Sequence, residues 1–238
     1  MRYPRLCALA FLALPLAFAG CVSGVNGSVN VPAGTSVSNA STVNGAVNIE
    51  ANAKVGKAST VNGSIHLAKG AQVGDAHTVN GSVTLAEQAT AESVSTVNGG
   101  AKLAKGATIS GDVSAVNGAL DLAEGSAIDG HVSNVNGHIS VDGAHVGHGI
   151  TTVNGGIDIT GKSVVDGGIT VKKPNDNGIF NLGNHDVPRI TIGAGATVNG
   201  PLLFEHPVKL YISDQAHVAG PINGATAVKY SGSSPPSS

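Results

Sequence analysis

The sequence contains very few aromatic residues, and none at all over most of its length. Its 238 residues include no Trp, 3 Tyr and 4 Phe, and no aromatic residue occurs between Val22 and Ile179. A core in this region must therefore consist of Val, Ile, Leu and Ala. The region also lacks the ring faces on which many sugar-binding sites stack their ligands.

Cysteine and proline are scarce as well. Of the 2 Cys, Cys7 lies in the N-terminal apolar segment, so a mature chain that starts at Cys21 cannot form an internal disulfide. No Pro occurs between Pro32 and Pro174, as expected where backbone N–H groups join hydrogen-bond ladders. Stability must come from burial and backbone pairing.

Neither sign of charge dominates. The chain has 13 Lys and Arg against 15 Asp and Glu, a net charge of −2, and two of the basic residues, Arg2 and Arg5, lie in the N-terminal segment. This balance excludes the basic surface that nucleic-acid binding requires.

The N-terminus has the layout of a secretory signal peptide, which we assign to residues 1–20. Arg2 and Arg5 precede an apolar run from Leu6 to Ala19, which is shorter than the ~20 residues of a transmembrane helix.

The end of this segment, AFAGC at 17–21, resembles the lipobox of bacterial lipoproteins, with Phe18 in place of the usual Leu. The resemblance implies that Cys21 becomes the acylated first residue of the mature chain. Ordinary cleavage that leaves a free Cys21 is the alternative. In lipoproteins an Asp after the Cys favours retention in the inner membrane, so Val22 implies the outer membrane.

One tripeptide recurs at nearly constant spacing. Val-Asn-Gly begins at Val25, Val43, Val61, Val79, Val97, Val116, Val135 and Val153, in steps of 18 or 19 residues. Asn-Gly usually predicts a hairpin turn, but a fixed period near 18 is typical of a solenoid. The apolar residues have no helical period.

The spacing therefore predicts an all-β fold, a single-stranded parallel β-helix of about ten coils with ~18 residues per coil. Each coil contributes two or three short strands that pair with the same strands of the next coil. In the unit at 59–76 we expect inward side chains at Val61, Ile65, Leu67, Ala71 and Val73. The 19-residue steps coincide with ISGDVSA (109–115) and IDGHVSN (128–134), where an extra residue is expected to bulge at a corner.

Charged residues recur at one position of the repeat. Eight residues after four successive repeat valines stand Lys69, Glu87, Lys105 and Glu124. Because their signs alternate, the register predicts a charge ladder along the solenoid. An exposed pair contributes only about 0.2 to 1 kcal/mol, so the ladder should affect register more than stability.

The repeated asparagines allow two interpretations. Strict alternation with Val61 inward would place Thr and Asn in rows on one flat outer face, for example Thr60 beside Asn62. Alternatively, Asn-Gly forms a bend, and each Asn amide bonds to the next coil in an internal ladder. Asn-Gly is a poor mid-strand sequence, which favours the bend. The ladder would contain Asn26, Asn44, Asn62, Asn80, Asn98, Asn117, Asn136 and Asn154.

The composition changes after residue 171. We assign 21–171 to the Val-Asn-Gly solenoid, 172–189 to a loop insertion, 190–230 to further solenoid coils with a cap, and 231–238 to a disordered tail. Phe204, Tyr211 and Tyr230 are expected to cap the open end of the tube.

The sequence offers no pattern that indicates an enzyme. The nine His are scattered over different registers, and Asp112, Asp129 and Asp142 do not share a column. His145 and His148 lack a supporting carboxylate pair, so we expect no metal site and no cofactor. The best pocket candidate is the loop of Asn184, His185 and Asp186 beside Glu205 and His206.

Three stretches resemble the bactofilins, which are polymer-forming cytoskeletal proteins. These are LAKGATISGDVSAVNG (103–118), LAEGSAIDGHVSNVNG (122–137) and IGAGATVNGPLLF (192–204). The resemblance implies a right-handed β-helix that polymerises end to end without nucleotide. The chain departs from this family in its lipoprotein-type signal and its regular Thr-Val-Asn-Gly. The hexad Val61, Leu67, Val73, Val79 also fits a left-handed β-helix, so the periodicity leaves handedness open.

Taken together, the sequence predicts a non-catalytic structural lipoprotein of the bacterial cell envelope, anchored to the membrane by lipid and able to self-associate as a scaffold. The alternative is an adhesin-like module that binds a cell-wall or surface polysaccharide, or ice, through a flat Thr/Asn face.

Overall fold

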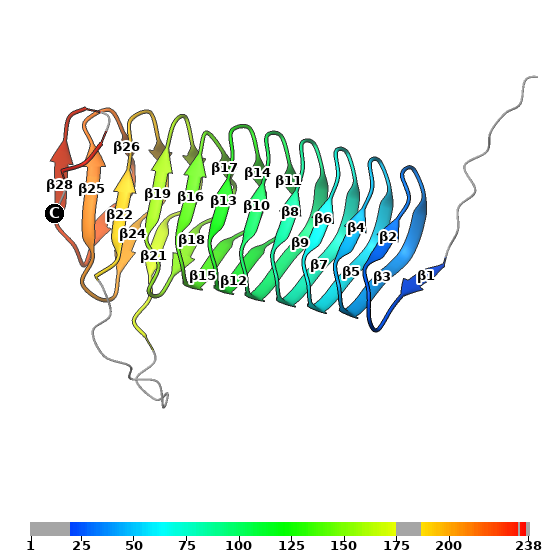
Figure 1. The fold of residues 1–238 in the computed structure, drawn as a ribbon. Helices are drawn as coiled ribbons and strands as arrows, with labels where there is room; N and C mark the ends of the chain where they lie inside the picture. Colours follow the sequence, from blue (N-terminus) through cyan, green and yellow to red (C-terminus); the bar gives the residue numbers. More distant parts are fainter. Residues whose placement is uncertain (1–19, 175–186, 233, 237–238) are drawn as a thin grey trace, which may run out of the picture.

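The protein is a straight rod of stacked coils (Figure 1). A computed structural model describes residues 20–174, 187–232 and 234–236. In these residues every strand pairing is parallel, and no segment is helical. The strands form two sheets that run the length of the rod, one of 11 and one of 17 strands. The rod is therefore a parallel β-solenoid, as the repeat predicted, with about eleven coils where about ten were expected.

The 11-stranded sheet contributes one short strand to each coil. Its strands are β2 (Val29–Val31), β4 (Val47–Ile49), β6 (Ile65–Leu67), β8 (Val83–Leu85), β10 (Ala101–Leu103), β13 (Leu120–Leu122), β16 (Ile139–Asp142), β19 (Ile157–Thr160), β22 (Arg189–Ile192), β25 (Lys209–Ser213) and β28 (Ala227–Tyr230). At about 4.8 Å per coil, the eleven strands span about 50 Å.

The 17-stranded sheet changes character along the rod. After β1 (Cys21–Ser23) come four long strands: β3 (Ser36–Asn44), β5 (Lys54–Asn62), β7 (Gln72–Asn80) and β9 (Thr90–Asn98). In the later coils each long strand is replaced by two short ones: β11 (Thr108–Ile109) and β12 (Val113–Asn117), β14 (Ala127–Ile128) and β15 (Val132–Asn136), β17 (His145–Val146) and β18 (Ile150–Thr152), β20 (Val164–Val165) and β21 (Ile169–Val171), β23 (Thr197–Val198) and β24 (Leu202–Phe204), β26 (His217–Val218) and β27 (Ile222–Asn223).

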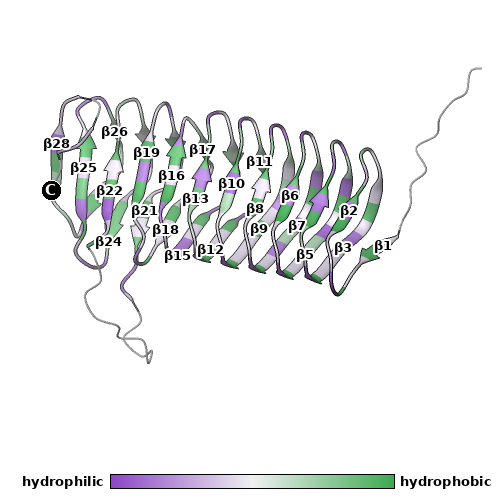
Figure 2. Ribbon diagram, in the orientation of Figure 1, coloured by the Kyte–Doolittle hydropathy of each residue, from purple (hydrophilic) through white to green (hydrophobic). Residues whose placement is uncertain are grey.

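The core is aliphatic and fills the tube from end to end. Apolar and polar residues alternate along the strands (Figure 2), and the inward positions stack on their own kind at coil spacing. In the coil that begins at β6, the side chains of Ile65, Leu67, Ala71 and Val73 are buried. This confirms four of the five inward positions expected for the unit.

The fifth expectation was wrong, because Val61 is 41% exposed whereas Thr60 is only 3% exposed. Alternation fails here since the chain does not run straight from Val61 to Ile65. Strand β5 ends at Asn62, and the chain turns a corner before β6 begins at Ile65. The corner resets which side chains face inward.

A second corner explains the 19-residue steps. In the register of β9 with its neighbours, Ala91 pairs with Ile109 and Val94 with Val113. Two residues separate the first members of these pairs, whereas three residues, 110–112, separate the second. The extra residue therefore lies at this corner, as predicted, and it divides each long strand into two short ones.

The C-terminal coils continue the same stack beyond an insertion. Strand β21 ends at Val171, and β22 begins at Arg189 in register with β19. The insertion thus leaves the solenoid at the corner that holds Val-Asn-Gly in the earlier coils. Residues 175–186, most of the loop expected at 172–189, lie outside the described residues, as does the expected signal peptide except for Gly20.

Of the three expected caps, only Phe204 lies in the tube. It belongs to the core cluster and stands in register with the inward Val171. Tyr211 is different, because its neighbours Leu210 and Ile212 point into the core and place it on the outer side of the sheet. There Arg189 covers its ring at 4.8 Å. The Tyr230 side chain also lies outside the core cluster.

Candidate interaction surfaces

The Thr of each early repeat points into the rod and closes the corner of the coil before it. Thr42, Thr60, Thr78 and Thr96 are all buried. Their Oγ1 atoms donate hydrogen bonds of 2.8–3.0 Å to the carbonyls of Gly27, Gly45, Gly63 and Gly81 respectively. The buried hydroxyl is thereby satisfied, and so is a carbonyl that the corner would otherwise leave unpaired.

The eight asparagines form one continuous ladder on the exposed edge next to this corner. Each Nδ2 donates to the Oδ1 of the preceding Asn at 2.8–3.0 Å, from Asn44 on Asn26 to Asn154 on Asn136. The amides are therefore bonded to one another yet face outward, so the ladder is not internal. It ends at Asn154, whose Oδ1 is buried without a hydrogen-bond partner in the described part of the chain.

The Gly of the motif is required by close approach of neighbouring coils. A Cβ at Gly63, Gly81 or Gly99 would overlap the carbonyl oxygen of the equivalent Gly in the coil before. The backbone N–H groups of these residues donate to the Asn carbonyls of the following coil, at 3.0, 3.1 and 2.8 Å. The corner is thus part of the ladder.

Beside the asparagine edge lies a flat, nearly uncharged strip, which we call the Val/Ser face. One of its columns contains the repeat valines Val25, Val43, Val61, Val79, Val97, Val116, Val135 and Val153. The other contains Ser41, Ser59, His77, Ser95, Ser114, Ser133 and Thr151. All of these side chains are exposed or half-buried, and His77 alone among them can ionise. An apolar column that faces solvent along eight coils is unusual for a monomer.

The predicted charge ladder resolves into two separate pairs. Lys69 Nζ lies 3.0 Å from Glu87 Oε2, and Lys105 Nζ lies 3.1 Å from Glu124 Oε2. Among the described residues, no ion pair joins Glu87 to Lys105. All four side chains are more than half exposed, so each pair contributes little to stability.

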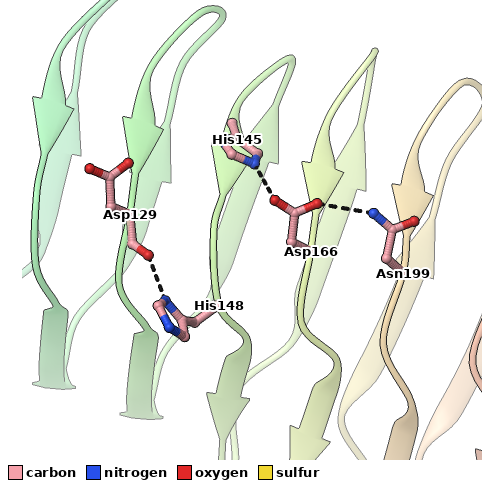
Figure 3. Close-up of polar contacts among 5 residues, drawn as sticks. All are labelled: Asp129, His145, His148, Asp166 and Asn199. Carbon is pink, nitrogen blue, oxygen red and sulfur yellow. Dashed lines mark hydrogen bonds and ion pairs between the residues drawn. The ribbon is translucent and has the colours of Figure 1, made fainter.

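Histidines and aspartates gather around the corner with the extra residue and bond across coils (Figure 3). His145 Nε2 lies 2.7 Å from Asp166 Oδ2, while Asn199 Nδ2 donates to Asp166 Oδ1 at 3.0 Å. These two hydrogen bonds lower the pKa of Asp166. His148 Nδ1 instead lies 2.6 Å from the Asp129 carbonyl. The contacts join neighbouring coils, and no group of three or more potential metal ligands occurs in the described ranges.

A further His–Asp pair lies on the 11-stranded sheet. His138 Nε2 is 3.1 Å from Asp158 Oδ2, and this hydrogen bond raises the pKa of His138 above its ordinary value of 6.5. Burial alone would raise the pKa of Asp158, but hydrogen bonds with His138 and Thr191 outweigh it and lower that pKa. The pair is half-buried and also joins adjacent coils.

The loop expected to form a pocket is described only at its base. Asn184, His185 and Asp186 lie outside the described residues. Glu205 Oε2 accepts a hydrogen bond from the backbone N–H of Lys173 at 2.9 Å, and His206 Nε2 lies 2.9 Å from the carbonyl of Val153. Glu205 therefore holds the base of the insertion against the rod, whereas His206 joins two coils of the rod itself.

Cys21 lies at one end of the molecule. It begins β1, the first strand of the rod, and its thiol is free and exposed. Its backbone pairs with that of Asn39 on the next coil.

Comparison with protein-family models, curated proteins and solved structures yields no match for this chain. None of the described segments is a helix long and apolar enough to cross a membrane.

The inward Thr was not predicted from the sequence. Its fixed place three residues before Gly, on the strand side of the turn, was a signal that could have revealed it. The groove described below was not predicted either.

Ala115 stands where the buried column would have a Thr, so the role of the Thr hydroxyl can be tested both by removing it elsewhere and by adding it here. Thr78→Val should lower the free energy of unfolding by about 1–3 kcal/mol, because the Gly63 carbonyl loses its partner. Ala115→Thr should raise it by about 0.5–1.5 kcal/mol by adding the corresponding bond to the Gly99 carbonyl. Urea unfolding followed by circular dichroism measures both. Thr84→Val, on an outward Thr of β8, is the control and should stay within about 0.5 kcal/mol. Equal effects of Thr78→Val and Thr84→Val would contradict this role.

Proposed function

We propose that this chain is a non-catalytic structural lipoprotein of the bacterial cell envelope, a rigid β-solenoid scaffold that associates side by side with copies of itself. The observation that carries the proposal is the Val/Ser face. It combines exposed valines, such as Val43 at 40% and Val116 at 38% exposure, with an almost complete lack of charge. Depletion of charge and exposed apolar area are what the centre of a protein interface requires.

The partner that best fits such a face is a second copy of it. Both columns repeat at the coil spacing, so two copies placed face to face present matching rows at every coil, as in the paired sheets of a steric zipper. The backbone of the face is already paired within the rod, so close packing leaves no polar backbone group unsatisfied.

The area of the face predicts weak association in solution. Eight coils at strand spacing and the three residues of strand that the two columns span give a strip of about 35 by 10 Å. This is roughly 350 Å² in plan, less than half of the ~800 Å² per partner of a standard interface. Anchoring to one membrane would raise the effective concentration of the rods and favour their pairing.

The anchor also argues for side-by-side rather than end-to-end contact. If Cys21 carries the lipid, β1 and the first coil lie against the membrane, and the rod projects up to about 50 Å from it. End-to-end stacking, which the bactofilin resemblance implied, would need this same end of the rod. Rods anchored at their first coils share one polarity, which allows their Val/Ser faces to meet about a two-fold axis parallel to the rods.

Binding of glycans or ice through a Thr/Asn face has less support. The Thr row of that face is buried in its first four repeats and already donates to glycine carbonyls. These four Thr side chains are therefore not available to a ligand.

Lipid attachment is tested by growing bacteria that express the chain with a clickable palmitate analogue. We expect label on the wild-type chain, recovery in the outer-membrane fraction, and loss of both on Cys21→Ser. Label retained by Cys21→Ser, or an unlabelled wild-type chain, would contradict the anchor.

Self-association is tested with the double variant Val61→Lys/Val97→Lys, which places two positive charges in the proposed contact. We expect its dimer dissociation constant, from sedimentation velocity, to be at least tenfold weaker. The matched control is Thr84→Lys/Ser140→Lys, which adds the same charge to the outer side of the 11-stranded sheet and should leave association unchanged. A strictly monomeric wild-type chain, or equal losses in both variants, would refute the proposal.

A further inference from the structure

A groove of about 660 Å³ runs along the rod on the 17-stranded sheet. It crosses the long strands β3, β5, β7 and β9, from Ser36 to Thr108, and Asp129 lies at its far end. At strand spacing these five coils give a length of about 20 Å. The volume lies within the range of ligand pockets.

The groove exists because the early coils have the shorter corner. There Gly56 and Gly74 follow Val55 and Val73, and each Gly approaches the carbonyl of the preceding coil too closely to carry a side chain. The floor is therefore shallow and consists of these glycines with the few exposed atoms of Val55 and Val73, whose side chains face the core and are only 4% and 5% exposed. The groove closes near Ser110, where the three-residue corner begins.

The walls offer side chains but no backbone. One wall is a column of polar side chains, among them Ser36, Gln72 and Thr90, spaced at the coil repeat. The backbone N–H and C=O groups of these strands are already used in the ladder between coils. An extended peptide could not add here as a strand, because that mode of binding needs a free sheet edge.

The charges of the groove are few and of mixed sign. Lys54 lies toward one end and Glu92 and Asp129 toward the other. A polyanion would meet the carboxylates and a polycation would meet the ammonium group, so the walls favour a ligand without net charge. Hydroxyl and amide side chains both donate and accept hydrogen bonds, which suits a ligand rich in hydroxyl groups.

We propose that this groove binds a linear, neutral, β-linked polysaccharide whose chain lies parallel to the rod axis. Such a chain repeats at a distance close to the strand spacing, so about five sugar units would each meet an equivalent set of walls. The apolar C–H faces of the sugars would lie on the shallow floor of Gly56 and Gly74 and their hydroxyl groups against the polar column. The groove lies apart from the Val/Ser face, so this inference does not rest on self-association.

Isothermal titration with β1→4-linked oligomers of glucose and of N-acetylglucosamine, from dimer to hexamer, tests the proposal on the purified chain. We expect at least one series to bind with a dissociation constant below about 1 mM at the hexamer. Affinity should rise at least tenfold from dimer to pentamer and then level off. Binding should change less than twofold between low and high salt.

Two variants locate the binding. Thr90→Arg, which fills the groove, should weaken hexamer binding at least tenfold, and Gln72→Arg at a more exposed position of the same wall should do the same if Thr90→Arg fails to fold. The control Thr84→Arg, on the opposite sheet, and the self-association variant Val61→Lys/Val97→Lys should bind as the wild type does. No binding of either series, affinity independent of length, preference for a charged oligomer or a peptide, or equal loss in the control would overturn the assignment.

Discussion

The rod depends on one contact repeated at each early coil, the stacking of a Thr-Val-Asn-Gly corner on the same corner of the coil before. There the Thr hydroxyl bonds to a glycine carbonyl, the Asn amide to the preceding Asn, and the Gly backbone to the next coil. The side-chain bond needs an Asn on both coils, and the close approach of the two corners needs a Gly. This mutual requirement explains why the motif recurs with so little change, whereas most outward positions vary freely.

Because this corner is fixed, variation is confined to the other corner, where it shapes the surface. In the early coils two residues separate the last inward side chain before this other corner from the first one after it, and a groove remains beside Val55 and Val73. In the later coils three residues separate them, as at 110–112, and the groove closes. The three-residue corner also displays side chains that bond across coils, such as Asp166 to His145 and Asn199. The extra residue at this corner recurs in the later coils. It therefore divides the rod into an N-terminal part with a groove and a C-terminal part with polar bonds between its coils.

Much of this fold follows from the sequence, because in a parallel stack the repeat length alone sets which residues meet. The 18-residue period correctly places Ile65, Leu67 and Val73 in the core and Lys69 beside Glu87. The period does not reveal where the chain turns. Alternation counted through the Asn-Gly turn exchanged Thr60 and Val61, since the turn residues belong to neither face. The groove was missed for a related reason, because it depends on how corner length changes the surface, which pattern analysis does not show.

Amide hydrogen exchange at the Val-Asn-Gly corner tests the central claim most directly. In the stacked arrangement the N–H groups of Gly63, Gly81 and Gly99 belong to the inter-coil ladder. They should exchange as slowly as the N–H groups of Ile65 and Val83 in the adjoining strands, within about tenfold. Exchange at these glycines several hundredfold faster than in the strands, as in an ordinary solvent-exposed turn, would contradict the account.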